Sequence, residues 1–412
     1  MKRKIIIALI LAIIGVATFF ILSRSEPIAS PAAPTAANQP EALSPDAASS
    51  SPERIAQPAL EKTPTPLRLP SGFSIGVFAK NLPSARVMIF DADGNIWLSQ
   101  TKEGIVSKIN IKDGLWTGQK IMLSNLDNPH GLAFDPQDSH ILYIAEETRI
   151  SKTVLKDGVP GVLEKIIDLP GGGNHFTRTL GFGPDGRLYV SIGSTCNVCL
   201  EKDTQRAAIY SLNKNGDDYR PVAKGLRNSP FFVWSAKNQM MWATEMGRDL
   251  LGDDTPPDEI NVIDTTSKSV LNFGWPICYG QNIHDTNFDK NTYFRNPCME
   301  PFELASRIDL QAHSAPLGLA FVPDNSAWPQ EYKNNLLVAF HGSWNRSVRT
   351  GYKVVRLILD DSGRKIAQED FISGWLTDSG VSGRPVGLIF DQNGSLYVSD
   401  DKAGMIYKVS TP

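Results

Sequence analysis

The sequence predicts an all-β protein, a six-bladed β-propeller with four-stranded blades, preceded by an N-terminal membrane anchor and a disordered linker. Three features support this prediction: a strand–turn–strand pattern that recurs along the chain, an apolar run near the N-terminus, and a segment rich in Pro, Ala and Ser between them. We therefore divide the chain into residues 1–23, 24–66 and 67–412, the last being the propeller domain.

The first segment has the pattern of a targeting element. Three basic residues precede an uninterrupted apolar run over residues 5–22, which is just long enough to cross a bilayer. Because basic flanks stay in the cytoplasm, the rest of the chain is expected outside it, periplasmic or otherwise extracytoplasmic, tethered by residues 5–22. A cleaved signal peptide is the alternative, and it places the domain on the same side.

Residues 24–66 are predicted to be a disordered spacer, the alternative being a structured N-terminal arm. Such a composition cannot bury enough apolar surface to offset the entropy of ordering the chain. The net charge of −3 gives no basic surface for nucleic acid, so no such partner is expected.

The body of the chain repeats one strand pair. The copies begin at Arg86, Pro129, Thr179, Asn228, Pro316 and Pro385. Turns such as Asp93-Gly94 and Asp185-Gly186 are strong hairpin signals between β-rich runs. Further strand-like runs, which would complete four-stranded blades, begin at Ile105, Ala207, Glu259 and Tyr352.

The spacing of the copies favours a propeller, since most recur at about the length of one blade with insertions. A stacked β-solenoid is the alternative, but its repeats are shorter and lack these paired-strand turns. The longer gap between the fourth and fifth copies, which contains NFGWPICYG from Asn272, predicts one long projecting loop.

The four cysteines are expected to form the disulfides Cys196–Cys199 and Cys278–Cys298, because an even count in an oxidising compartment favours disulfides. A redox-active CxxC at Cys196 is the alternative, although no thioredoxin-like βαβ pattern surrounds it.

His175 is the strongest catalytic candidate. It follows three glycines and precedes an inner strand, and the ordinary imidazole pKa suits proton abstraction near neutral pH. A turn-capping role is the alternative.

Cationic, imidazole and amide side chains stand at the starts of several copies: Arg86, His130, Arg227, Asn228 and Arg384. Arginines that converge on one opening repel each other unless an anion lies between them, which predicts an anionic ligand.

Two further loops follow inner hairpins. Gly247 and Arg248 lie next to acidic residues, where backbone carbonyls suit Ca²⁺, the alternative being a solvated acidic loop. His341, Trp344 and Asn345 follow the fifth hairpin, where the Trp can cover a flat ring or fill a gap between blades.

Together these residues resemble the glucose/sorbosone dehydrogenase family, the soluble-type sugar dehydrogenases that use pyrroloquinoline quinone (PQQ). The motifs are PHGLAF, NHFTRTLGFGPDGRLYVSIG, GLRN, ATEMG, DEINVI and NFGWP, while HGSWNR and the C-terminal GRPVGLIFDQNGSLYVSDD resemble the sorbosone/pyranose dehydrogenase branch.

The resemblance implies that His175 is the general base as hydride passes from the sugar to the quinone, while the carbonyls of Gly247 and Arg248 hold the Ca²⁺ that polarises it. It places the remaining candidates at the cofactor: Arg227, Asn228, Arg384, Trp344, Asn345 and His341, and more weakly Arg86 and His130. A sugar substrate and an electron acceptor, a quinone pool or a cytochrome, follow.

The sequence also departs from the family pattern. Asn174 stands where the glucose enzyme has Asp, no lysine lies beside His341, and Val386 replaces a second arginine. These departures leave the cofactor affinity and the sugar preference open. Two other functions are the alternatives: a non-catalytic sugar- or protein-binding propeller, and a Ca²⁺-dependent lactonase-like hydrolase.

Overall fold

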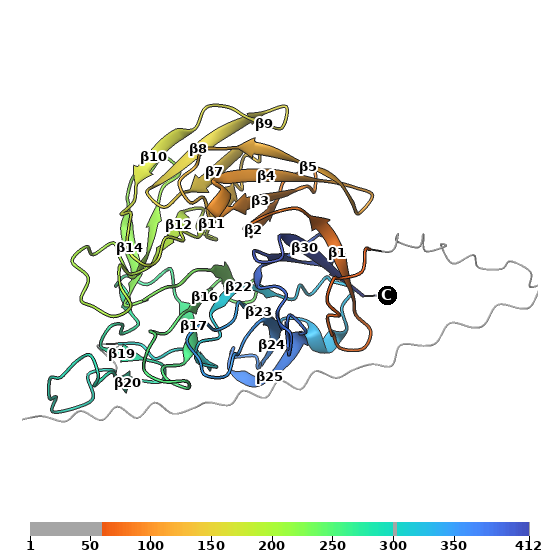
Figure 1. Cartoon of the computed structure of the whole chain (residues 1–412). Helices are drawn as coiled ribbons and strands as arrows, with labels where there is room; N and C mark the ends of the chain where they lie inside the picture. Colours follow the sequence, from red (N-terminus) through yellow and green to blue (C-terminus); the bar gives the residue numbers. More distant parts are fainter. Residues whose placement is uncertain (1–59, 300–302, 412) are drawn as a thin grey trace, which may run out of the picture. The chain divides into compact units, whose positions relative to one another are not determined.

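The computed structural model describes residues 60–299 and 303–411. These form six sheets, antiparallel except for one short added strand in the third, that are arranged as blades around a common axis (Figure 1). The predicted six-bladed propeller with four-stranded blades is therefore confirmed. The predicted anchor and most of the predicted linker lie outside the described residues. Within the described part of the chain, no helix is long and apolar enough to cross a bilayer.

The first three blades each begin with a hairpin predicted from the sequence. The strands of blade 1 are β2 (Ala85–Phe90), β3 (Ile96–Gln100), β4 (Ile105–Lys112) and β5 (Leu115–Leu123). Those of blade 2 are β6 (Gly131–Phe134), β7 (Ile141–Ala145), β8 (Arg149–Lys156) and β10 (Glu164–Asp168), with β9 (Val159–Pro160) paired to β8. Those of blade 3 are β11 (Leu180–Phe182), β12 (Leu188–Ile192), β13 (Ala208–Leu212) and β14 (Arg220–Lys224), extended by β18 (Leu271–Asn272).

The other three blades follow the same order, except that the last recruits its outer strand from the beginning of the domain. The strands of blade 4 are β15 (Phe232–Trp234), β16 (Met241–Glu245), β17 (Asp258–Ile263) and β21 (Ile308–Leu310). Those of blade 5 are β22 (Pro316–Phe321), β23 (Leu336–Phe340), β24 (Lys353–Leu359) and β25 (Lys365–Ile372). Those of blade 6 are β28 (Pro385–Phe390), β29 (Leu396–Asp400), β30 (Met405–Ser410) and β1 (Ser74–Lys80).

The remaining elements are short. They are the 3₁₀ turns η1 (Thr101–Glu103) and η2 (Gln330–Tyr332) and the two-stranded ribbons β19 (Cys278–Tyr279) with β20 (Ile283–His284) and β26 (Leu376–Thr377) with β27 (Gly380–Val381). The ribbon β19–β20 lies in the long loop that was predicted between the fourth and fifth hairpins.

Pairing of β1 with β30 joins the two ends of the domain and closes the ring of blades. The segment before β1 also contacts blade 6: Glu61 pairs with Val77 and forms a 2.7 Å ion pair with Lys80. Residues from Glu61 onward, which the sequence assigned to the linker, therefore contact blade 6.

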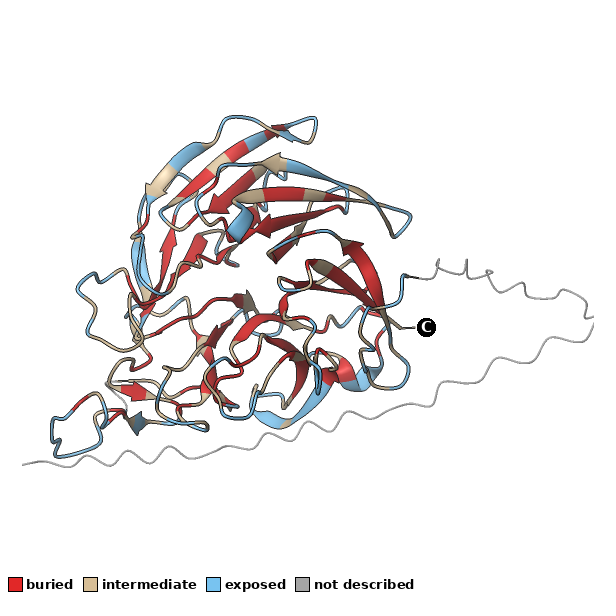
Figure 2. Ribbon diagram, viewed as in Figure 1, coloured by how far each residue is buried: buried red, intermediate tan, exposed pale blue. Residues whose placement is uncertain are grey.

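The second strand of each blade is buried on both faces, because each blade is packed between two neighbours (Figure 2). Ala133 and Tyr143 of blade 2, for example, pack against Leu180 and Val190 of blade 3. The exposed residues gather on outer strands such as β25.

Glycines let the innermost strands approach one another. A Cβ at Gly131 would lie 2.4 Å from the Arg178 carbonyl oxygen of blade 3, and one at Gly318 would lie 2.3 Å from the Val386 oxygen of blade 6. Any larger residue would push neighbouring blades apart, which explains the Pro-x-Gly-Leu pattern that recurs in the inner strands.

Both predicted disulfides are present, Cys196–Cys199 and Cys278–Cys298. The first closes a loop that follows β12, and the second ties the ribbon β19–β20 to the end of the long loop.

Candidate active site

The hairpin repeat brings the predicted site residues to one face. In each hairpin the first strand begins opposite the residue at which the second strand ends, as Ala85 pairs with Gln100 and Pro385 with Asp400. Residues just before the first strand of a hairpin therefore lie beside residues just after its second strand. Because all six blades have the same orientation around the axis, these residues lie on the same face of the propeller in every blade.

A cavity of about 810 Å³ lies on this face. It is lined by side chains of blades 1, 5 and 6 and by Phe176, which follows His175. The lining residues are Ser84, Arg86, Thr101, Lys102, Phe176, His341, Ser343, Trp344, Arg346, Arg349, Tyr352, Val381, Arg384, Asp401 and Lys402.

The lining of the cavity is strongly cationic. Six Lys and Arg side chains face a single carboxylate, that of Asp401. Asp401 binds the Nη1 of Arg86 at 2.8 Å and the Nε2 of His341 at 2.9 Å. Burial acts to raise the pKa of Asp401, but the His341 hydrogen bond and the arginine charges outweigh it and hold the pKa below its usual range. Asp401 is therefore an anion, and the cavity keeps a large excess of positive charge.

Arg384 lies at the start of blade 6, and its guanidinium has no carboxylate partner among the described residues. Its Nη2 donates to the Gly342 carbonyl at 3.1 Å, and its guanidinium lies 5.2 Å from the centre of the Tyr352 ring. The Nε of Arg86 is likewise a buried donor without a partner in the described part of the chain. The Arg384 guanidinium is thus available to an anion in the cavity, whereas Arg86 is paired with Asp401.

His175 is held in one tautomer. Its Nδ1 lies 2.8 Å from the Ser194 carbonyl oxygen, which can only accept, so Nδ1 carries the hydrogen and Nε2 keeps its lone pair. Burial lowers the pKa of His175 to about 4, and the charge of Arg227 acts in the same direction. The imidazole is consequently neutral at physiological pH.

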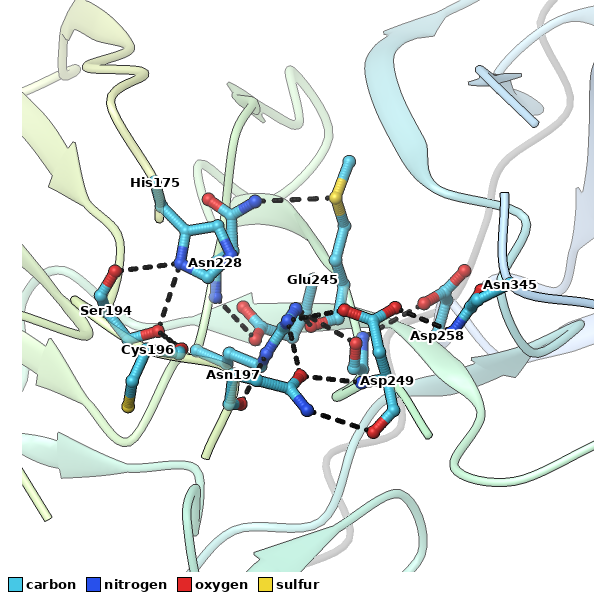
Figure 3. Close-up of polar contacts among 12 residues, drawn as sticks. His175, Ser194, Cys196, Asn197, Asn228, Glu245, Asp249, Asp258 and Asn345 are labelled. Carbon is cyan, nitrogen blue, oxygen red and sulfur yellow. Dashed lines mark hydrogen bonds and ion pairs between the residues drawn. The ribbon is translucent and has the colours of Figure 1, made fainter. Parts of the chain in front are cut away.

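Asn228 lies next to His175, as Figure 3 shows. Both side chains pack against Gly193, where a Cβ would lie 2.6 Å from the His175 Cβ and 2.9 Å from the Asn228 Oδ1. The Asn228 backbone N–H donates to Glu245 at 2.9 Å, and Ser229 donates to the same carboxyl group at 2.7 Å. Burial, together with the charge of Glu259, raises the pKa of Glu245 to about 8.

Arg227 is 5% exposed, and its guanidinium joins three loops. It donates to the backbone oxygens of Asn197 and Gly247 at 2.8 and 3.0 Å and forms a 3.0 Å ion pair with Asp249. Its side chain is therefore saturated by protein partners and organises the site from within.

The two predicted calcium ligands lie in the loop after β16. The Gly247 oxygen already accepts a hydrogen bond from Arg227, and the Arg248 side chain forms a 3.1 Å ion pair with Asp285. A carbonyl has two lone pairs, so Gly247 can still accept a second partner. Any cation there would share its oxygen with a guanidinium.

Trp344 and Asn345 are neighbours in the chain but differ in exposure. Trp344 is 73% exposed at the cavity rim, where it is free to cover a ligand. Asn345 donates to Asp249 at 2.9 Å, while its Oδ1 is a buried acceptor without a partner in the described chain.

His130 is fully buried. Its ring lies 5.3 Å from that of Phe231, and its Nδ1 lies 3.3 Å from the Thr179 hydroxyl. These contacts are typical of a packed core residue, in contrast to the open positions of Arg86 and Arg384.

Several functional candidates were missed by sequence reasoning. Lys102 and Lys402 bring lysines to the cavity from blades 1 and 6, although no lysine stands beside His341. Asp401, Ser194 and Asn197 also belong to the site. All five follow the second strand of a hairpin, and that position was the available signal.

Comparison with known proteins agrees with the motifs. The TrAA12-like family model matches residues 67–412. An uncharacterized protein of Borreliella burgdorferi is 32% identical over 85% of this chain and 92% of its own length. The pyrroloquinoline quinone-dependent pyranose dehydrogenase of Coprinopsis cinerea is 24% identical over 83% of this chain, which spans only 54% of that relative.

Solved structures share the fold. The holo form of the pyranose dehydrogenase PQQ domain from Coprinopsis cinerea superposes with a TM-score of 0.71 at 20% identity, covering 86% of this chain and 99% of that one. The resemblance inferred from the motifs is thereby confirmed, and the chain belongs to the TrAA12-like family.

Proposed function

We propose that this protein is a PQQ-dependent sugar dehydrogenase that oxidises the CH–OH group of an aldose or a related sugar, sorbosone-like or pyranose. The observation that carries the proposal is a neutral histidine with a free Nε2, held on the same face as a cationic cavity. The names of the relatives support the same chemistry.

The cavity fits the cofactor by charge and by open donors. PQQ is a flat tricarboxylate, and the four cations without a carboxylate partner in the described chain, Lys102, Arg349, Arg384 and Lys402, match that charge. When bound, the quinone supplies the acceptor for the hydride that leaves the sugar carbon.

The residues of this chain would then do the following. The Nε2 of His175 takes the proton of the sugar hydroxyl, while the Ser194 carbonyl holds the ring through Nδ1. Asn228 would offer its side-chain amide beside His175, and Trp344 would cover a ligand from the cavity rim.

We include Ca²⁺ in the proposal because the site offers suitable oxygen ligands. Backbone oxygens of the Gly247–Arg248 turn are the hard ligands that Ca²⁺ prefers, and the ion would act there as a Lewis acid. If it is required, a chelator should abolish dye reduction and added Ca²⁺ should restore it.

We also propose an extracytoplasmic location, because both disulfides need an oxidising compartment to persist. Electrons would pass from there to a quinone pool or a cytochrome.

The test is an absorption titration of the purified protein with PQQ and Ca²⁺, followed by a dye-reduction assay with aldoses, pyranoses and sorbosone-like aldehydes. The proposal expects uptake of the quinone and sugar-dependent reduction of the dye. Sugar binding without quinone uptake would instead identify a binding propeller. Lactone hydrolysis without quinone would identify a hydrolase.

The pH profile gives a second prediction. Because burial and Arg227 lower the pKa of His175, its base form persists well below the ordinary value of 6.5. We expect kcat/KM to stay level from neutral pH downward and to fall only below pH 6.5. Circular dichroism at each pH controls for unfolding, and an acid limb centred at 6.5 or above would contradict this environment for the base.

A third prediction concerns cofactor charge. Arg384→Gln should weaken PQQ binding by about 10- to 100-fold, the usual effect of one charge-assisted hydrogen bond. Salt should weaken binding by the wild-type protein more than by the variant, because screening acts on the charge that was removed. Arg364→Gln, at an exposed arginine paired with Asp360, is the matched control, and equal affinities in both variants would remove Arg384 from the cofactor site.

A further inference from the structure

The disulfide-closed loop of residues 196–199, here called the CxxC loop, contacts both the support of His175 and the side chain of Arg227. It follows β12, and the disulfide Cys196–Cys199 closes it. Ser194, just before it, donates its backbone N–H to the Arg227 oxygen at 2.7 Å. The loop is thus connected both to the strand that carries the His175 support and to the segment that enters blade 4.

Asn197, inside the CxxC loop, is bound on all sides. Its Oδ1 accepts from the Asp249 backbone N–H at 2.8 Å and from the Nη2 of Arg227 at 2.9 Å. Its Nδ2 donates to the Asp249 backbone oxygen at 3.0 Å, which fixes the orientation of the amide. Its own backbone oxygen accepts from the Nε of Arg227 at 2.8 Å. Figure 3 shows this arrangement between Asn197 and Asp249.

These bonds set the position of two charged side chains at once. With Asn197 in place, the guanidinium of Arg227 is oriented by two of its nitrogens and reaches the Gly247 oxygen with a third. Asp249, in turn, accepts from Arg227 and from Asn345, so the chain of contacts extends to the loop of Trp344.

The same loop supports His175. The Ser194 hydroxyl donates to the Cys196 carbonyl at 2.7 Å and lies 3.0 Å from the His175 Nδ1. Glu201, just beyond the loop, accepts from the Thr195 hydroxyl at 2.9 Å. Both the base and the arginine therefore depend on one short loop, the conformations of which the disulfide restricts.

We propose that the CxxC loop is the positioning element of this site and that Asn197, by holding Arg227 and Asp249, fixes the loops of Gly247 and Asn345 in the geometry that binds the cofactor. This inference rests on the proposed function. The role of the disulfide in this proposal is structural, because it holds Asn197 and the Cys196 carbonyl in place. It does not carry electrons in the proposed reaction.

The test compares Asn197→Ala with Asn197→Asp. The Ala variant loses three side-chain hydrogen bonds, and we expect PQQ affinity to fall about 10- to 100-fold, while the sugar KM at saturating PQQ stays close to the wild-type value. The Asp variant keeps the acceptor toward Arg227 and Asp249 but loses the donor to the Asp249 oxygen, so it should recover only part of the affinity. The control is Asn215→Ala, an exposed turn residue of blade 3 that donates one hydrogen bond to Asp217.

A readout that needs neither cofactor nor substrate accompanies it. Hydrogen exchange at the Asp249 amide of the unliganded protein should accelerate in Asn197→Ala and stay slow in Asn215→Ala. The double variant Cys196→Ser/Cys199→Ser, which leaves every hydrogen bond possible but removes the covalent closure, should show the same direction of change in exchange and in affinity.

The outcomes separate the two proposals. If the wild-type protein takes up no PQQ, the proposed function fails, whatever the exchange shows. If the wild type binds PQQ and Asn197→Ala binds it equally well, the positioning role is wrong. If the double serine variant matches the wild type in both readouts, the disulfide has no part in positioning.

Discussion

His175→Ala is expected to lower kcat about 10²- to 10⁴-fold, the range that a general base contributes. The free Nε2 is the group that would accept the hydroxyl proton, and alanine offers no replacement. Since the cationic cavity that binds the anion is formed by other side chains, PQQ uptake should remain close to that of the wild type. Single-turnover dye reduction and absorption titration measure the two effects separately.

The matched control for this variant is His140→Ala, an exposed histidine in the β6–β7 turn that lies 3.1 Å from Asp138. It should keep full activity. Full activity in His175→Ala would remove the histidine from the reaction, while a parallel loss of PQQ binding would make it a cofactor ligand rather than a base.

Arg227→Ala is expected to lower the free energy of unfolding by about 3–5 kcal/mol, the effect of removing one partner from a buried ion pair. The substitution leaves the partly buried Asp249 without its cationic partner and removes the donor to the Asn197 and Gly247 oxygens. PQQ affinity should fall as well, because the Asn228 segment loses its anchor. Urea unfolding and absorption titration measure the two losses.

Arg187→Ala serves as the control for Arg227→Ala. Arg187 also makes several hydrogen bonds, to Ser211, Asn213 and Asp218, but at the turn end of blade 3. It should cost stability without affecting PQQ binding. Arg227→Lys should rescue only part of the loss, since an ammonium group cannot match a planar fork of donors. If Arg227→Ala were as stable as the wild type, the central place of this side chain in the site would be wrong.

Sequence reasoning predicted the fold well because a propeller repeats one local pattern. Turns such as Asp93-Gly94 dictate a hairpin wherever they occur, and six hairpins with further strands leave few ways to bury their faces. The placement of His175 and Arg227 on the same face of the propeller could also be predicted, because hairpin geometry puts every residue that precedes an inner strand on that face.

The boundary of the linker and the contacts of each site residue could not be predicted from the sequence. Glu61 looked like part of a polar spacer, yet it pairs with Val77 once β1 has closed the ring. His130 and Arg86 occupy equivalent sequence positions, but His130 is buried against Phe231 while Arg86 reaches the cavity. Packing between blades decides such differences, and no single repeat contains it.

The sequence by itself determined the number of blades and the face on which the chemistry is expected, because both depend on short-range turn signals and strand direction. The tertiary structure alone decided that Asn197 meets Arg227 and Asp249, and that lysines from blades 1 and 6 line the cavity. Those contacts join residues of different blades, and their distances arise only when the blades pack around one axis.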